Sequence, residues 1–375
     1  MRLKNLSLPA FLKYVCKKDL ICLGAGKLLQ EFFTVCPTVK IKAVMDNSEK
    51  KQSSGISYQG EKFNVYPVSY LPVLIINPSQ SVILITASVA GGGMSIYEQM
   101  KSMNLPDEVE CFFINFIMAD SASIPTVGEK LNFRLTEKTL IPSTIHYCWF
   151  GGGEIPDWQK ELIHGWKKKN PRFEIVRWDE SNYDVRQNKY IAKAYDEKKW
   201  AFVSDFARKD IVCRYGGIYL DVDVEVIKSL DDLLYQQGFF GVQPDRRVSS
   251  GLGFGGMPGL DVIQEMRDVY LEEDFLYTDA MGMKVAPDYE TEILMGHGYI
   301  RNGNLQQVNG LTIYPAEVLS VTLPYSDQSF ITENTYTVHH YAGSWTEWQR
   351  QRRQKKAIEL YEEIMNKENR KFTPD

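Results

Sequence analysis

In the segment 200–230, a helical pattern passes directly into a buried strand and an acidic triplet. Apolar side chains in its first half recur at the period of an amphipathic helix, and Gly216 and Gly217 end that helix. A short apolar strand follows and delivers Asp221 and Asp223 at its carboxyl end, the edge at which open α/β sheets place ligands. The segment therefore predicts an α/β fold with a site at this edge.

The acidic triplet is a candidate metal site. Asp221 and Asp223 are two residues apart, so on a regular strand both carboxylates project from one face. Oxygen ligands of this kind suit Mn²⁺ or Mg²⁺ better than zinc. Asp205 and Arg208, spaced i,i+3, project together from the preceding helix. The alternative is that the two aspartates are solvated strand-end residues, because short acidic triplets are common.

The first third of the chain alternates strands and helices, which predicts a small parallel sheet covered by helices. The mostly polar segment 119–139 has no strand period, so we place a domain boundary near residue 135. The predicted domains are 1–135, Rossmann-like, and 136–375, a second α/β domain that includes a terminal helix over 345–367. The predicted strands of the first domain are Asp19–Leu23, Lys40–Met45, Ser81–Ala87 and Glu110–Phe116, with a helix around Met94–Met103.

A glycine-rich turn follows the first of these strands. Gly24 and Gly26 lie between a strand and a helix, and Asp46 ends the next strand twenty residues later, as in the dinucleotide fingerprint. Leu29 stands where the third glycine of that fingerprint is expected. One interpretation is a nucleotide-binding loop, and the other is a tight strand-to-helix turn built from small residues.

Composition excludes several classes of protein. The 43 Lys and Arg residues against 48 Asp and Glu give a net charge of −5, so no global positive field favours nucleic acid. The six cysteines include no CxxC pair. No apolar run reaches the roughly 18 residues of a membrane span, and the N-terminus lacks the apolar centre of a signal peptide. We therefore expect a cytoplasmic protein.

Four blocks of the sequence occur in the order IPSTIHYCWFGGGEIP, NPRFEIVRWDESNYD, WAFVSDFARKDIVCRYGGIYLDVDVEV and VHHYAGSW. Together they resemble the DXD-containing sugar transferases of glycosyltransferase family thirty-two, which are similar to the glucosylating domains of large clostridial toxins. The resemblance covers roughly residues 139–348 and implies a GT-A fold, a nucleotide-sugar donor with Mn²⁺ or Mg²⁺, and retention of anomeric configuration. Residues 17–118 resemble small Rossmann-like domains attached to bacterial polysaccharide-biosynthesis enzymes.

The resemblance also implies roles for individual residues. Asp221 and Asp223 match the contacts to the metal and the diphosphate, and Asp205 and Arg208 match contacts to the ribose and sugar of the donor. Trp149 stands where an aromatic ring stacks on the nucleotide base, although core packing is the alternative.

The block near the C-terminus implies a third metal ligand. The spacing of His340 and Gly343 looks like the His-x-x-Gly metal site of other GT-A enzymes, so His340 is favoured over His339. Ser344 and Trp345 are assigned to the donor site. The glycine-dense segment 249–259 is assigned to the sugar or acceptor pocket, since it lacks the Lys-Ser/Thr of a phosphate-binding P-loop.

The leading functional prediction is a metal-dependent, retaining hexosyltransferase that uses a UDP- or GDP-sugar. Its acceptor is expected to be a glycan or lipid-linked glycan of a bacterial surface polysaccharide. A toxin-like enzyme with a protein acceptor, an NAD-dependent oxidoreductase using Gly24 and Gly26, and a non-enzymatic sugar-binding protein are the alternatives. Five basic residues in 350–356 predict either peripheral contact with the inner face of the plasma membrane or a solvated helix face.

Overall fold

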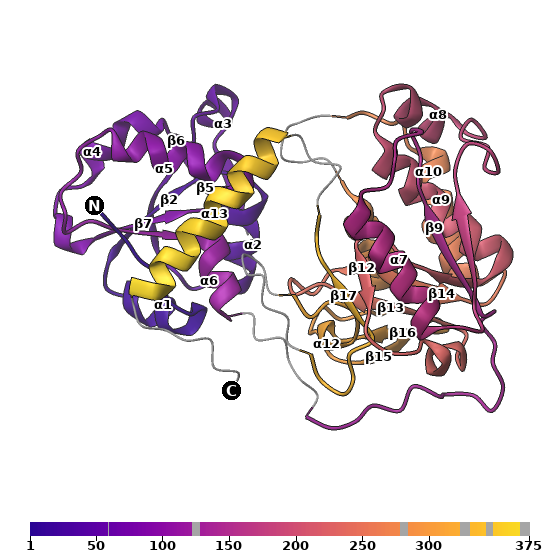
Figure 1. The fold of residues 1–375 in the computed structure, drawn as a ribbon. Helices are drawn as coiled ribbons and strands as arrows, with labels where there is room; N and C mark the ends of the chain where they lie inside the picture. The colour runs from indigo at the N-terminus through magenta and orange to yellow at the C-terminus, as the bar shows by residue number, and fades with distance from the viewer. Residues whose placement is uncertain (59, 122–127, 278–283, 323–330, 343–347, 368–375) are drawn as a thin grey trace. The chain divides into compact units, whose positions relative to one another are not determined.

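The computed structural model describes residues 1–58, 60–121, 128–277, 284–322, 331–342 and 348–367, which form two units (Figure 1). Of these residues, the first unit comprises those within 1–121 and 348–367, and the second comprises those within 128–342. The predicted boundary near residue 135 therefore lies too far along the chain.

The C-terminal helix α13 (Trp348–Lys367) corrects a second part of the predicted division. It belongs to the first unit, because Ala357, Tyr361 and Ile364 are buried in that unit's core. An apolar stripe on a helix shows that the helix covers a core. Which of two cores it covers depends on the path of the chain in space, and its position in the sequence suggested the wrong one.

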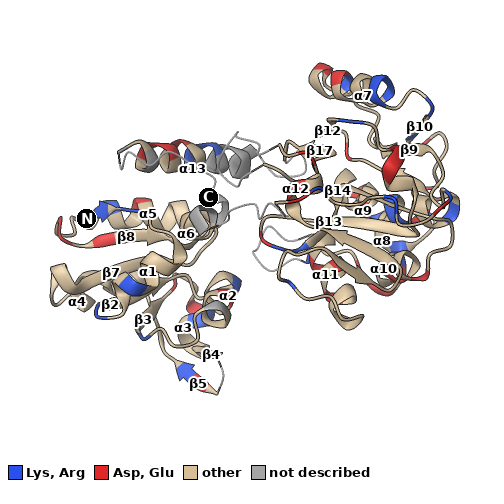
Figure 2. Ribbon diagram, turned by 90° about the horizontal axis from the view of Figure 1, so that it is seen from below, with Lys and Arg blue, Asp and Glu red and all other residues tan. Residues whose placement is uncertain are grey.

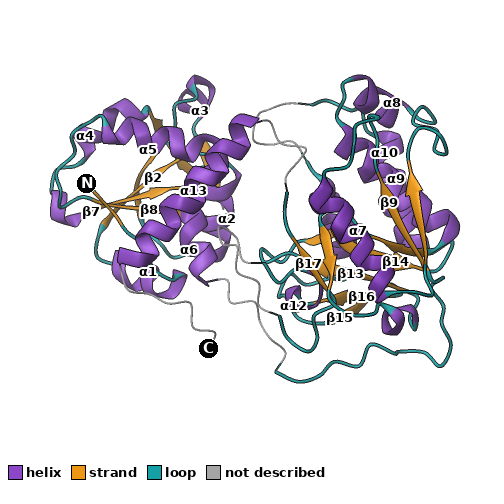
Figure 3. Cartoon of the chain, in the orientation of Figure 1, coloured by secondary structure: helices purple, strands orange, loops and turns teal. Residues whose placement is uncertain are grey.

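The first unit contains a six-stranded, entirely parallel sheet in the order β1-β8-β7-β2-β3-β6. Helices cover both of its faces (Figure 3), so its central strands are apolar at nearly every position. A separate hairpin joins β4 and β5. The strands are β1 (Arg2–Leu3), β2 (Asp19–Leu23), β3 (Ile41–Met45), β4 (Ile56–Tyr58), β5 (Glu61–Phe63), β6 (Val65–Tyr66), β7 (Ser81–Ile85) and β8 (Glu110–Phe113).

Alternate side chains of these strands enter two separate cores, as the strand period requires. One core is shared with α1, α2 and α6, and the other with α4, α5 and α13. The predicted strand over 110–116 is too long, because its second half begins α6; an apolar run alone does not distinguish a buried strand from a buried helix. The helices are α1 (Leu8–Val15), α2 (Lys27–Val35), α3 (Glu49–Ser54), α4 (Leu71–Leu74), α5 (Met94–Lys101) and α6 (Ile114–Ser121).

The second unit contains a seven-stranded mixed sheet in the order β10-β9-β11-β14-β13-β16-β15. Parallel pairs join β9 to β10 and β11, and β13 to β16, while the remaining pairs are antiparallel. The strands of this sheet are β9 (Thr144–Cys148), β10 (Glu174–Trp178), β11 (Gly217–Tyr219), β13 (Gly238–Val242), β14 (Val248–Gly256), β15 (Gln306–Val308) and β16 (Leu311–Tyr314).

A small antiparallel pair, β12 (Val224–Val226) with β17 (Thr337–His339), stands apart from this sheet. The α/β class predicted from the sequence is confirmed, and the second unit is consistent with the GT-A type. Its helices are α7 (Asp157–Lys169), α8 (Lys189–Asp196), α9 (Trp200–Tyr215), α10 (Asp261–Glu272), α11 (Ala286–Gly296) and α12 (Ala316–Leu319).

Basic and acidic residues both occur along the helices of each unit (Figure 2). Among the described residues, none of the helices combines the length and hydropathy that a membrane-spanning segment needs.

Candidate active site

The two aspartates of the acidic triplet lie in a turn rather than on one strand. Strand β11 ends at Tyr219 and β12 begins at Val224, so Asp221 and Asp223 occupy the connection between them. The Val224 amide donates to the Asp221 carbonyl at 3.0 Å, which closes the turn. The prediction that the two carboxylates share a strand face was therefore wrong. Their side chains approach each other because the backbone bends between them.

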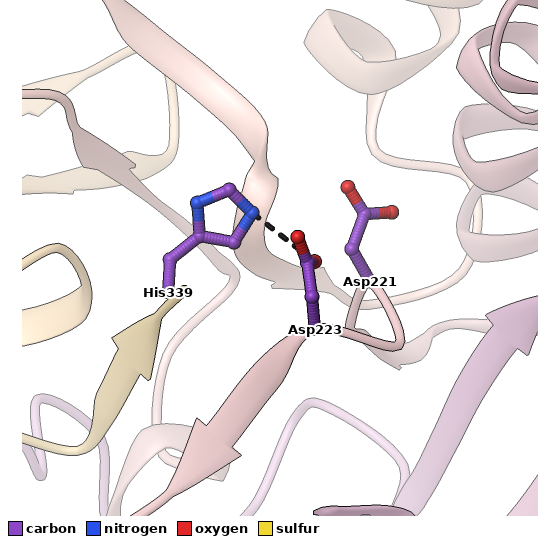
Figure 4. Close-up of side chains that lie close together, drawn as sticks. All are labelled: Asp221, Asp223 and His339. Carbon is purple, nitrogen blue, oxygen red and sulfur yellow. Dashed lines mark ion pairs between the residues drawn. The ribbon is translucent and has the colours of Figure 1, made fainter. Parts of the chain in front are cut away.

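His339 completes a cluster of three ligand-type side chains. One donor atom from each of Asp221, Asp223 and His339 lies within 4.8 Å of the others (Figure 4). His339 Nε2 is 3.3 Å from Asp223 Oδ1. Pairing of β12 with β17 sets His339 opposite Val224 and so brings the histidine next to the turn. The Ala342 amide donates to Asp223 Oδ2 at 2.9 Å, which orients that carboxylate.

His340, the histidine favoured by the sequence, does not join this cluster. Its Nε2 lies 3.0 Å from Glu225 Oε2, and both side chains are more than one third exposed. The ring of Trp158 stands edge-on to the His340 ring, with centroids 6.4 Å apart. Neighbouring residues at the end of a strand point in different directions, so only one of the two histidines reaches the aspartates. The structure reverses the predicted order of preference.

Helix α9 contributes the remaining charged groups of the site. Arg208 pairs with Asp205 on the same helix, and its Nη1 lies 3.4 Å from Asp221 Oδ2. The guanidinium also lies over the ring of Tyr219, 5.4 Å from the centroid. The Arg208 side chain is only 7% exposed. The structure thus brings Asp205, Arg208, Asp221 and Asp223 together, with the arginine between the helix and the turn.

The site carries more negative than positive charge. Burial raises the pKa of Asp221; Arg208 opposes this, and the neighbouring Asp223 adds to it. Burial alone would also raise the pKa of Asp223, but His339 and the Ala342 amide lower it to about 2. Burial works against a charged His339, yet the two aspartates outweigh it and raise the pKa of the imidazole. The carboxylates of Asp205, Asp221 and Asp223 face one guanidinium and one imidazole. Of these groups, the two carboxylates and the imidazole of the cluster offer oxygen and nitrogen ligands that fit Mn²⁺ or Mg²⁺.

Trp149 lies just beyond β9. Its side chain is partly buried against the core of the second unit, and its indole N–H donates to the Gly153 carbonyl at 2.6 Å. Trp149 thus packs against the core on one side and keeps part of its ring accessible, so its stacking on a nucleotide base stays a prediction. Two further residues predicted for the donor site, Ser344 and Trp345, lie outside the described residues.

Gly24, Gly26 and Asp46 belong to the first unit. Gly24 has a φ of +116°, and a Cβ there would lie 2.8 Å from the Ala87 amide nitrogen. The Asp46 carboxylate accepts from the amides of Ala25 and Ser48 and pairs with Lys51 at 2.9 Å. These partners outweigh the effect of burial and lower the pKa of Asp46. The carboxylate is thus engaged within its own loop, which favours the interpretation as a tight turn.

The sequence did not reveal a buried polar group behind α9. Lys209 and Glu290 form an ion pair at 2.7 Å, and neither side chain is exposed. Glu290 in turn accepts from the backbone amide and hydroxyl of Ser250. A lysine on the inward side of a largely apolar helix is a signal that a closer examination of the pattern could have found. Its partner lies 81 residues away in the chain and shares no local pattern with it.

Comparison with known proteins agrees with this site. Residues 156–240 match the family described as "Glycosyltransferase sugar-binding region containing DXD motif". An uncharacterized glycosyltransferase of Acanthamoeba polyphaga mimivirus is 27% identical over 221 residues, which cover 55% of this chain and 84% of that protein. Inositol phosphoceramide mannosyltransferase 3 of Schizosaccharomyces pombe is 33% identical over 33% of this chain and 35% of its own length.

A solved structure named PaToxG Glycosyltransferase matches with a TM-score of 0.35 and 19% identity, over 48% of this chain and 78% of its own. Within the matched region 156–240, the DXD pattern is Asp221-Val222-Asp223. The resemblance found in the sequence is confirmed for residues 156–240, which match the glycosyltransferase sugar-binding region containing a DXD motif.

Proposed function

We propose that this protein is a metal-dependent hexosyltransferase that uses a UDP- or GDP-sugar donor and retains the anomeric configuration. The observation that carries the proposal is the meeting of Asp221, Asp223 and His339 within 4.8 Å of one another, beside the buried Arg208. Such a constellation has no evident structural use, because it concentrates negative charge that burial makes costly.

Asp221, Asp223 and His339 would hold Mn²⁺ or Mg²⁺. Such a cation, when bound, neutralises charge on the nucleoside diphosphate that leaves. Asp205 and Arg208 lie on the helix side of the cluster. We assign the Asp205 carboxylate to accept hydrogen bonds from hydroxyl groups of the donor, and the Arg208 guanidinium to donate to its sugar and phosphate oxygens. Holding the donor in this way orients its anomeric carbon toward the acceptor.

The transfer itself needs no protein base. The acceptor hydroxyl forms a bond to the anomeric carbon on the side from which the phosphate leaves. The bond between that carbon and the phosphate oxygen breaks, and the departing phosphate takes the proton of the acceptor. The roles of the protein are therefore to position the donor and to stabilise charge.

The proposal also covers the acceptor and the place of the enzyme in the cell. We propose a glycan or lipid-linked glycan of a bacterial surface polysaccharide, reached by a cytoplasmic enzyme that contacts the inner face of the plasma membrane through its C-terminal helix. The mannosyltransferase name of one relative supports a hexose donor. The test of membrane contact is co-sedimentation with anionic vesicles before and after the basic residues of 350–356 are replaced by Gln. No change in co-sedimentation would refute the membrane contact.

The test is donor hydrolysis and thermal shift across UDP- and GDP-sugars, with Mn²⁺ or EDTA, on the wild type and on Asp223→Ala. A response to one donor that requires the metal and disappears in the variant is expected. Because Glu225 lies two residues away and outside the cluster, Glu225→Ala is the matched control and should respond like the wild type. Stabilisation by NAD with no response to any nucleotide-sugar would refute the proposal and favour the oxidoreductase alternative.

A further inference from the structure

Strand β14 carries a four-residue bulge beside the candidate active site. Ser249 pairs with Gly241 on β13, whereas the next pairing joins Phe254 to Phe240. The four residues Ser250–Gly253 therefore bulge out of the ladder with β13. They also precede the first pair with β11, which joins Tyr219 to Phe254. Bulges of this kind often lie next to active sites, where they direct the main chain toward a ligand.

The bulge lies against the residues of the site. A Cβ on Gly251 would lie 2.9 Å from Asp221 Oδ2 and 3.4 Å from Arg208 Nη1. At Gly253, where φ is +108°, a Cβ would lie 2.8 Å from the side chain of Leu220. The main chain of the bulge thus forms a wall against the Asp221 carboxylate and the Arg208 guanidinium. Only glycine leaves that space open.

A bulge without ladder bonds needs other partners for its buried polar groups. Glu290 of α11 supplies them: its Oε2 accepts from the Ser250 amide at 2.8 Å, and its Oε1 accepts from the Ser250 hydroxyl. A second bond from α11 holds the strand just before the bulge, since the Val248 amide donates to Thr291 Oγ1 at 3.0 Å. Helix α11 therefore takes the place of the missing strand partner.

Lys209 makes it tolerable to bury the Glu290 carboxylate. Its Nζ lies 2.7 Å from Glu290 Oε1, donates to the Asp205 carbonyl at 3.0 Å and lies over the ring of Tyr270. The buried ion pair of Lys209 and Glu290 thus connects the backbone of α9 at Asp205 to the bulge. Buried pairs are weak evidence for stability, because apolar residues of similar volume often serve as well.

We propose that Glu290 is a positioning residue that holds the bulge Ser250–Gly253 as the wall of the donor-sugar pocket beside Asp221 and Arg208. Lys209 serves as the buried counter-ion of its carboxylate. The proposal rests on the proposed function and goes beyond it by identifying what shapes the pocket. Neither residue touches the donor. Glu290 acts through the Ser250 amide and hydroxyl, and through them on the position of Gly251 beside Asp221.

Two neutral double variants separate positioning from simple stability. Lys209→Met with Glu290→Gln keeps an acceptor for the Ser250 amide, whereas Lys209→Met with Glu290→Leu removes it. Both replace a buried pair by neutral side chains, so both are expected to fold. Leu233→Ala, at a fully buried site that no contact described above involves, is the control for lost stability. Each protein is assayed well below its melting temperature.

The measurements are the kcat and KM of donor hydrolysis and hydrogen exchange of the segment 248–256. The Gln variant is expected to retain turnover and protection near wild-type levels. In the Leu variant the Ser250 amide should exchange faster and kcat/KM should fall by about 10²-fold, as for a misplacement near 1 Å. Equal turnover and equal exchange in the two double variants would overturn the proposal. A wild type that turns over no nucleotide-sugar would refute the proposed function, and the exchange comparison would still decide whether Glu290 holds the bulge.

Discussion

His146, on β9, should make the stability of the second unit depend on pH. It is 3% exposed, and its two ring nitrogens have partners that suit the neutral form. Nε2 lies 2.9 Å from the Gly216 carbonyl, and Nδ1 accepts from the indole N–H of Trp178 at 3.2 Å. Protonation of Nδ1 would place its N–H opposite the indole N–H of Trp178, and this hydrogen bond would be lost. Burial, partly offset by the bond to Gly216, lowers the pKa of His146 to about 4.

The sign and size of the effect follow from that pKa. Between the ordinary value of 6.5 and about 4, the unfolded chain binds a proton that the folded protein does not. Stability is therefore unaffected above the ordinary pKa and decreases as the pH falls through this window. A change in proton affinity of this size is worth about 3 kcal/mol, at about 1.4 kcal/mol for each tenfold step.

The assay is urea unfolding of the wild type and His146→Gln, followed by intrinsic fluorescence. Glutamine keeps polar atoms beside Gly216 and does not titrate. The signal reports mainly the second unit, because that unit contains Trp149, Trp158, Trp166, Trp178 and Trp200. Other titrating groups are common to both proteins and cancel in the comparison. From about pH 7.5 to about pH 4.5, the wild type should lose about 2.5 kcal/mol more than the variant. A difference that stays constant over this range would refute the reasoning.

Two further predictions concern the site, and a third concerns helix α7. His339→Ala should weaken Mn²⁺ binding by about 10- to 100-fold, and His340→Ala should leave it unchanged. Titration followed by the Mn²⁺ electron paramagnetic resonance signal measures both affinities, and the opposite order would contradict the ligand assignment. Gly251→Ala should lower donor turnover with little change in melting temperature, because its methyl group would press on Asp221 from 2.9 Å; wild-type kinetics would show that the wall is farther from the donor than we infer. Gly165→Ala, where the new methyl group meets nothing within 4 Å, should raise stability by about 0.5–1 kcal/mol without changing turnover, and a loss in urea unfolding would contradict the open space seen there.

Local sequence patterns predicted those strands and helices that are apolar at most positions because both of their faces are buried. The strand Asp19–Leu23 was predicted with the bounds that the structure has, and the predicted end of the helix at Gly216 agrees with α9, which ends at Tyr215. The DXD pattern was visible because both aspartates lie within three positions. The strand predicted over 110–116 was too long, since an apolar run carries no information about where a strand gives way to a helix.

Local patterns were enough to predict the α/β class, the candidate ligands Asp221 and Asp223, and the nearby pair Asp205 and Arg208. They did not predict that the aspartates lie in a turn or that His339, rather than His340, faces them. A ligand set is completed by contacts between segments far apart in the chain. Pairing of β12 with β17 brings His339 to the turn, and the packing of α11 brings Glu290 to the bulge of β14. No local periodicity encodes either approach.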